Sequence, residues 1–113
     1  LSAYGSLDGA LVSDTRKTVV PSPTTGYRII TYTLIGDIDT ADVALSLYLV
    51  NSNTTPETVR RLFTIDLKAD EPLVLLEGGD RAVLLPGQSL QAALAGPIAT
   101  RQPSFWSCWE DWA

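Results

Sequence analysis

The chain has 113 residues, 45% of them hydrophobic and 19% charged, which is typical of one globular domain. Its formal net charge is -5, so we expect no nucleic-acid partner, because phosphate backbones are bound mainly by Lys and Arg. It contains no histidine, which excludes Ser-His-Asp and Cys-His catalysis and the common zinc sites.

The N-terminal region has weak strand signals. We interpret residues 1–14 as an extended N-terminal arm of the same domain. The segments ALVSD and TRKTVVP, residues 10–14 and 15–21, are expected to supply one or two further strands.

Two segments in the first half of the chain have the composition of β-strands. Residues 27–36, YRIITYTLIG, are rich in β-branched and aromatic side chains, and we expect both faces of this strand to be largely covered. Strict alternation gives one face with Ile29, Thr31, Thr33 and Ile35, and another with Ile30, Tyr32 and Leu34. Residues 43–51, VALSLYLVN, predict a strand with one strongly apolar face. The apolar positions of that face are Val43, Leu45, Leu47 and Leu49.

The segment at residues 59–68, VRRLFTIDLK, predicts a strand with one solvent-exposed face. Alternation places on one side Val59, Arg61, Phe63, Ile65 and Leu67. A helix over TPETVRRLF, capped by Thr55, is the alternative. The alternating, β-branched continuation favours the strand.

Turn residues separate the strands of the second half. Gly78-Gly79-Asp80 predicts a tight hairpin between the apolar runs PLVLLE and RAVLL. Pro86-Gly87 suits the centre of a type II turn, which leads into QSLQAALAG. There we expect a core face of Leu90, Ala92 and Leu94. Gly96-Pro97 precedes the last strand, which we place at about residues 98–112.

These elements predict the fold class. Seven to nine short strands with turn signals every 8 to 12 residues indicate an all-β, single-domain antiparallel β-sandwich over residues 1–113. No apolar run approaches the ~18 residues that a membrane span needs, so we expect no membrane partner.

Candidate catalytic and metal-binding groups are sparse. Asp37, Asp39 and Asp42 have a spacing that superficially suits calcium, but aspartates also favour turns, and we prefer the turn. Glu110 and Asp111 would diverge on a strand, which argues against a glycosidase pair. We therefore predict no enzyme activity, no metal and no cofactor.

The C-terminal segment PSFWSCWEDWA, residues 103–113, holds all three tryptophans. On a regular strand Trp106 and Trp112 share one face with Cys108 and Glu110, and Phe105 and Trp109 share the other. Three rings on one flat platform would need a bulge, so sugar stacking is the less favoured use. The candidate protein–protein interface consists of Arg60, Arg61, Phe105, Trp106, Trp109 and Trp112.

The order of these segments resembles a known group of proteins. The run VVPSPTTGYRIITYTLIGD is followed by VALSLYLVNS, by PLVLLEGG at residues 72–79 and by PGQSL at residues 86–90. Together with the closing aromatic strand, this order is similar to that of small tailed-bacteriophage virion proteins with a jelly-roll-like β-sandwich. The resemblance covers about residues 18–112 and rests on hydrophobic patterns and turns.

The resemblance implies a location in the virion and a structural role. A capsid cement or decoration subunit, bound to the major capsid protein, is the favoured role. A neck or tail accessory protein and a carbohydrate- or receptor-binding β-sandwich module are the alternatives. The resemblance also implies a homo-oligomer, for which a symmetric trimer is one arrangement.

Overall fold

The computed structural model describes residues 2–11, 15–36, 43–67, 72–76, 82–95 and 103–112. In these ranges it has strands and no helix, so no helix of the described chain could cross a membrane. The strands are β1 (Ser2–Ala10), β2 (Lys17–Val20), β3 (Tyr27–Gly36), β4 (Val43–Asn51), β5 (Thr58–Leu67), β6 (Leu73–Leu76), β7 (Ala82–Leu84), β8 (Gln88–Leu94) and β9 (Ser104–Trp112). The predicted all-β class is confirmed, and so is the preference for a strand over a helix at β5.

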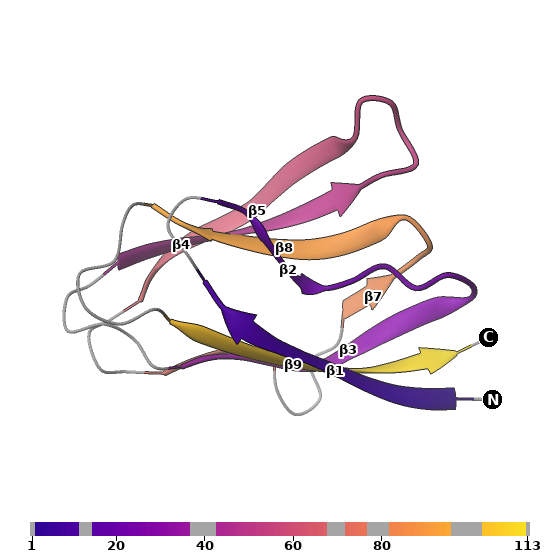
Figure 1. The fold of residues 1–113 in the computed structure, drawn as a ribbon, viewed down its shortest axis with the longest axis horizontal. Helices are drawn as coiled ribbons and strands as arrows, with labels where there is room; N and C mark the ends of the chain where they lie inside the picture. The colour runs from indigo at the N-terminus through magenta and orange to yellow at the C-terminus, as the bar shows by residue number, and fades with distance from the viewer. Residues whose placement is uncertain are drawn as a thin grey trace.

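The strands form two antiparallel sheets, which Figure 1 shows as two layers. One sheet has the order β1-β9-β3-β6, with β7 also paired to β3, and the other has the order β2-β8-β4-β5. Strands from the start and the end of the chain therefore alternate within each sheet, as they do in a jelly roll. The predicted jelly-roll-like β-sandwich is confirmed.

The core lies between the two sheets, where their inward side chains meet. Its largest fully buried side chains include Phe105, Ile30, Ile35 and Leu45. Leu90, Ala92 and Leu94 form the core face of β8 as predicted, and Leu45 and Leu47 do the same for β4. Alternation therefore predicted the inward faces of β4 and β8 correctly.

A bulge in β3 changes the faces predicted for that strand. The pairing of β3 with β9 shifts between Ile30 and Tyr32, so Thr31 is an extra residue. Beyond it, the buried positions are Thr33 and Ile35, on the side of Ile30. The prediction that Ile29 shares a face with Thr33 and Ile35 is wrong, because the bulge inverts the alternation.

A second bulge lies in β5, where the pairing with β4 passes from Leu47–Phe63 to Tyr48–Arg61 and leaves Leu62 without a partner on β4. Arg61 therefore shares the outer face of the sheet with Tyr48, while Phe63 shares the inner face with Leu47. The prediction of one continuous face from Val59 to Leu67 is wrong for this reason. Most of β5 is also exposed on both sides, rather than on one.

The turn between β7 and β8 has the predicted form. The amide of Gln88 donates to the carbonyl of Leu85 at 2.9 Å, and Gly87 has a φ of 90°. These features define a type II turn, in which glycine accepts the positive φ. The side chain of Asn53 covers this turn and donates to the carbonyl of Pro86 at 2.8 Å.

The first strand is part of the sandwich. Strand β1 pairs with β9 along its whole length, from Ser2–Trp112 to Ala10–Ser104. Three of the predicted features lie outside the described residues. These are the acidic cluster of Asp37, Asp39 and Asp42, the Gly78-Gly79-Asp80 hairpin and the Gly96-Pro97 boundary.

Candidate interaction surface

Strand β9 sends its aromatic rings to both faces of its sheet, as alternation predicted. Phe105 and Trp109 point inward and are only 2% and 7% exposed. Trp106 and Trp112 point outward and are 48% and 37% exposed. Since β9 lies between β1 and β3, the outward rings stand in the middle of the sheet rather than at its edge.

Tyrosines from the two neighbouring strands extend this surface. Tyr4 of β1, which lies opposite Glu110, is 81% exposed, and Tyr27 of β3 lies opposite Trp112. Tyr32 packs edge-on against Trp106, with ring centroids 5.5 Å apart and an interplanar angle of 66°. We call the five rings the outer aromatic face; they are Tyr4, Tyr27, Tyr32, Trp106 and Trp112.

Aliphatic and acidic side chains complete the same side of the sheet. By register, Ile29, Leu34 and Val83 lie among or beside the rings, and Val83 is exposed. The carboxylates of Asp8 and Glu110 lie on this side as well. The face is thus broad and apolar with negative charge, and extended exposed apolar patches mark interaction sites.

Two hollows flank Trp106. One, of about 420 Å³, is lined by Asp8, Leu34, Gly36, Ser104, Phe105 and Trp106. The other, of about 380 Å³, is lined by Tyr4, Gly5, Ser6, Thr31, Trp106, Cys108 and Trp109. Each therefore combines aromatic surface with polar groups that can form hydrogen bonds.

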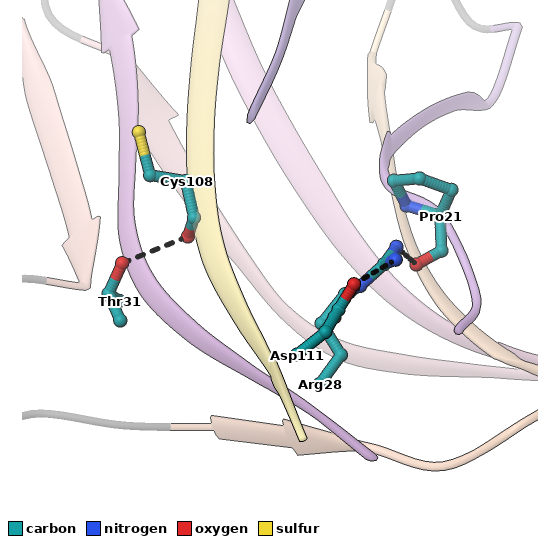
Figure 2. A network of polar contacts seen from close by, with 5 residues as sticks. All are labelled: Pro21, Arg28, Thr31, Cys108 and Asp111. Carbon is teal, nitrogen blue, oxygen red and sulfur yellow. Dashed lines mark hydrogen bonds and ion pairs between the residues drawn. The ribbon is translucent and has the colours of Figure 1, made fainter. Parts of the chain in front are cut away.

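Arg28 fixes the C-terminal end of β9 through polar contacts with Asp111 and Pro21, which Figure 2 shows. Its Nε and Nη2 donate to the two carboxylate oxygens of Asp111 at 2.6 and 2.9 Å, and Nη1 donates to the carbonyl of Pro21 at 2.6 Å. The guanidinium also lies 4.5 Å from the centroid of the Trp109 ring. Arg28 therefore positions β9 and is a structural residue rather than a member of the exposed surface.

The bulge of β3 is fixed nearby by a second contact in Figure 2. The hydroxyl of Thr31 donates to the carbonyl of Cys108 at 3.2 Å. This contact stabilises the bulge, and the bulge sets the alternation of Tyr32 and Leu34 on the outer side.

The six residues of the predicted interface do not form one surface. Phe105 and Trp109 are in the core, and Trp106 and Trp112 lie on the outer aromatic face. Arg60 and Arg61 are exposed on opposite faces of β5, in the other sheet. Any surface that includes both the tryptophans and the arginines must therefore wrap around the molecule.

The described residues contain no group of three or more His, Cys, Asp or Glu side chains that could hold a metal ion. Glu110 lies on the outer face, while Asp111 is bound to Arg28 on the inner side. The sheet therefore separates these two carboxylates. Cys108 is a free, half-buried thiol.

Comparisons with known proteins assign no family to this chain. No family model matches it, and no curated protein does. Its function is therefore inferred from the surfaces described above, together with the resemblance in its strand and turn motifs.

Proposed function

We propose that this chain is a structural protein of a tailed-bacteriophage virion, in which it serves as a capsid cement subunit. Its outer aromatic face would bind the major capsid protein. One observation carries the proposal, namely the exposure of Tyr4, Trp106 and Trp112 on the same side of a β-sheet. Tyr and Trp are enriched in the centres of protein interfaces.

The geometry of the face suits a passive binding role. Its rings come from three adjacent strands, and Arg28 anchors the strand that carries both exposed tryptophans. The backbone that carries these rings is therefore ordered before binding, which lowers the entropy cost of forming the complex. The mechanism would be burial of this face across the seam between shell subunits, so that disassembly must first expose it again.

The negative charge of the outer aromatic face indicates what kind of surface the partner would present. Asp8 and Glu110 put negative charge beside the rings. A complementary surface would therefore be apolar at its centre and would carry Lys or Arg at its rim. The resemblance adds the expectation of a homo-oligomer, with a trimer as one arrangement, and leaves a neck or tail protein as the alternative partner.

Carbohydrate binding is the second candidate, and the hollows beside Trp106 favour it. The larger hollow places the Asp8 carboxylate and the Ser104 hydroxyl next to the indole ring. A sugar could stack on the ring and form hydrogen bonds with these groups. This candidate would make the chain a receptor-binding module of the same virion.

Coexpression with the major capsid protein of the same genome tests the first proposal. We expect the chain to sediment with assembled shells in a fixed ratio. The double variant Tyr4→Ser/Trp106→Ser should lose binding, because one central aromatic ring contributes about 2 kcal/mol or more in a protein interface. Leu62→Ser removes an exposed apolar side chain of β5, in the other sheet, and is the control that should still bind.

The outcomes separate the candidates. A chain that stays in the supernatant, or a double variant that binds shells as well as the wild type, contradicts the cement proposal. Association with neck or tail proteins in purified particles would support the alternative partner. Glycan-array binding that Trp106→Ser abolishes, without sedimentation on shells, would support the carbohydrate module.

A further inference from the structure

Strand β5 is an unusually exposed sheet edge. It ends the β2-β8-β4-β5 sheet, and among the described residues it pairs with β4 alone. Val59, Leu62, Phe63 and Ile65 are 39%, 50%, 40% and 38% exposed. Figure 1 shows the β4–β5 hairpin rising away from the other sheet toward its turn. An apolar edge strand of this length is a template for pairing with another strand.

The bulge at Leu62 sorts the polar and apolar residues of β5 onto separate faces. The outer face of β5 carries Arg61, Thr64 and Asp66, which are in register with outward-facing residues of β4. Phe63 and Ile65 lie on the inner face, in register with Leu47 and Leu45. From Arg61 to Leu67, apart from the extra residue Leu62, β5 therefore has a polar outer side with both charge signs and an apolar inner side.

The residues of β5 can complement those of a second β5 strand. When two β5 strands run antiparallel about a two-fold axis at Thr64, Phe63 of each copy faces Ile65 of the other on the inner side. On the outer side, Arg61 of each copy then faces Asp66 of the other. Aromatic–β-branched pairs and opposite-charge pairs are the cross-strand contacts that stabilise antiparallel sheets.

We propose that two copies of this chain associate through β5 in this register, which joins their four-stranded sheets into one continuous sheet. The interface is isologous and closed, so the β5 edge of each copy is covered by the other copy and no filament can grow from it. The inference goes beyond the proposed virion role and does not depend on it, since β5 belongs to the sheet opposite the outer aromatic face.

The bulge and the charges select this register over its neighbours. If Leu62 occupied a regular strand position instead of a bulge, the same axis would place Arg61 opposite Leu67. An axis at Arg61 would oppose two guanidinium groups, and an axis at Phe63 would place Asp66 opposite Val59. Bulges and edge charges usually discourage strand pairing. Here the bulge and the charges would oppose pairing with an unrelated strand, whereas a second copy of β5 would place an opposite charge against each of these charges.

Dilution series of the purified chain, measured by native mass spectrometry and sedimentation velocity, test the proposal. We expect a dimer in the wild type. Asp66→Arg places like charges opposite each other twice in each dimer, and we expect its dissociation constant to rise about tenfold or more. The exchange variant Arg61→Asp/Asp66→Arg should restore the dimer, because it restores opposite charges in both pairs.

Asp8→Arg is the matched control, since it makes the same change of charge on the other sheet and should leave the dimer intact. Thermal unfolding of each variant shows that it is folded. A wild type that is monomeric or trimeric overturns the proposal, and so does an Asp66→Arg variant that dimerises like the wild type. A folded exchange variant that stays monomeric also overturns it. The test needs no virion partner, so its result is separate from that of the shell experiment.

Discussion

Strand β9 carries two pairs of aromatic residues. Phe105 and Trp109 are buried on its inner face, whereas Trp106 and Trp112 are exposed on its outer face. The neighbouring strand β1 accounts for part of this difference. On the inner side, Gly5 and Gly9 of β1 lie opposite Trp109 and Phe105. A Cβ atom at Gly5 would overlap the indole of Trp109, and one at Gly9 would lie 2.9 Å from the Phe105 ring. The inner rings are thus buried over glycines that leave room for them.

On the outer side, β1 offers larger and polar residues instead. Asp8 lies opposite Trp106, and Tyr4 is exposed on the same face. No second layer covers the outer rings within the described chain, and they remain in solvent. The comparison teaches that one strand can stabilise the fold with one face and present exposed aromatic rings with the other.

The largest expected effect is on the inner side. Trp109→Ala should lower the free energy of unfolding by ~3–5 kcal/mol, because it opens a cavity in the core. It would also remove the ring that lies beside Arg28. Denaturant unfolding measures the loss. A variant with the stability of the wild type would contradict the assignment of Trp109 to the core.

The glycines of β1 should give the next largest effect. Gly5→Val should destabilise the fold by ~1–3 kcal/mol, because its side chain would overlap the rigid ring of Trp109. Ser6→Val is the control on the outer face, where the added methyl groups would meet solvent. Thermal unfolding of the two variants compares the faces directly. Equal effects would show that the inner ring can move aside.

The smallest effect is expected on the outer side. Trp106→Ala should change the free energy of unfolding by less than ~1 kcal/mol, the usual range for an exposed residue with one edge-on aromatic contact. In single-tryptophan variants, acrylamide should quench the fluorescence of Trp106 much more strongly than that of Trp109. A loss of stability comparable to that of Trp109→Ala would remove the distinction between the two faces.

Local patterns were sufficient to predict most strands. Strands β3 and β4 have the bounds predicted for residues 27–36 and 43–51, and the Pro86-Gly87 turn has the predicted type. Alternation and turn chemistry act over a few neighbouring residues, which is why they can be recognised in a sequence. The faces of the aromatic residues in β9 follow from the same local rule.

Features that depend on strand register were not predictable. The bulges at Thr31 and Leu62 are defined only by the partner strands, so strict alternation assigned the wrong faces there. The ion pair of Arg28 and Asp111 joins residues 83 positions apart. Tyr4 and Tyr27 join the outer aromatic face only because β1 and β3 flank β9, and that order depends on the topology.

The place of β9 in its sheet has a consequence for how the protein folds. Strand β9 follows the other strands of the described residues in sequence, yet it lies between β1 and β3. During synthesis, neither β1 nor β3 can form its pairing with β9 until residues 104–112 have left the ribosome. Pairing between distant segments is slow because a long loop must close first. Assembly of this sheet should therefore be a late step of folding, and removal of β9 should leave β1 unpaired and one edge of β3 exposed, which would favour aggregation.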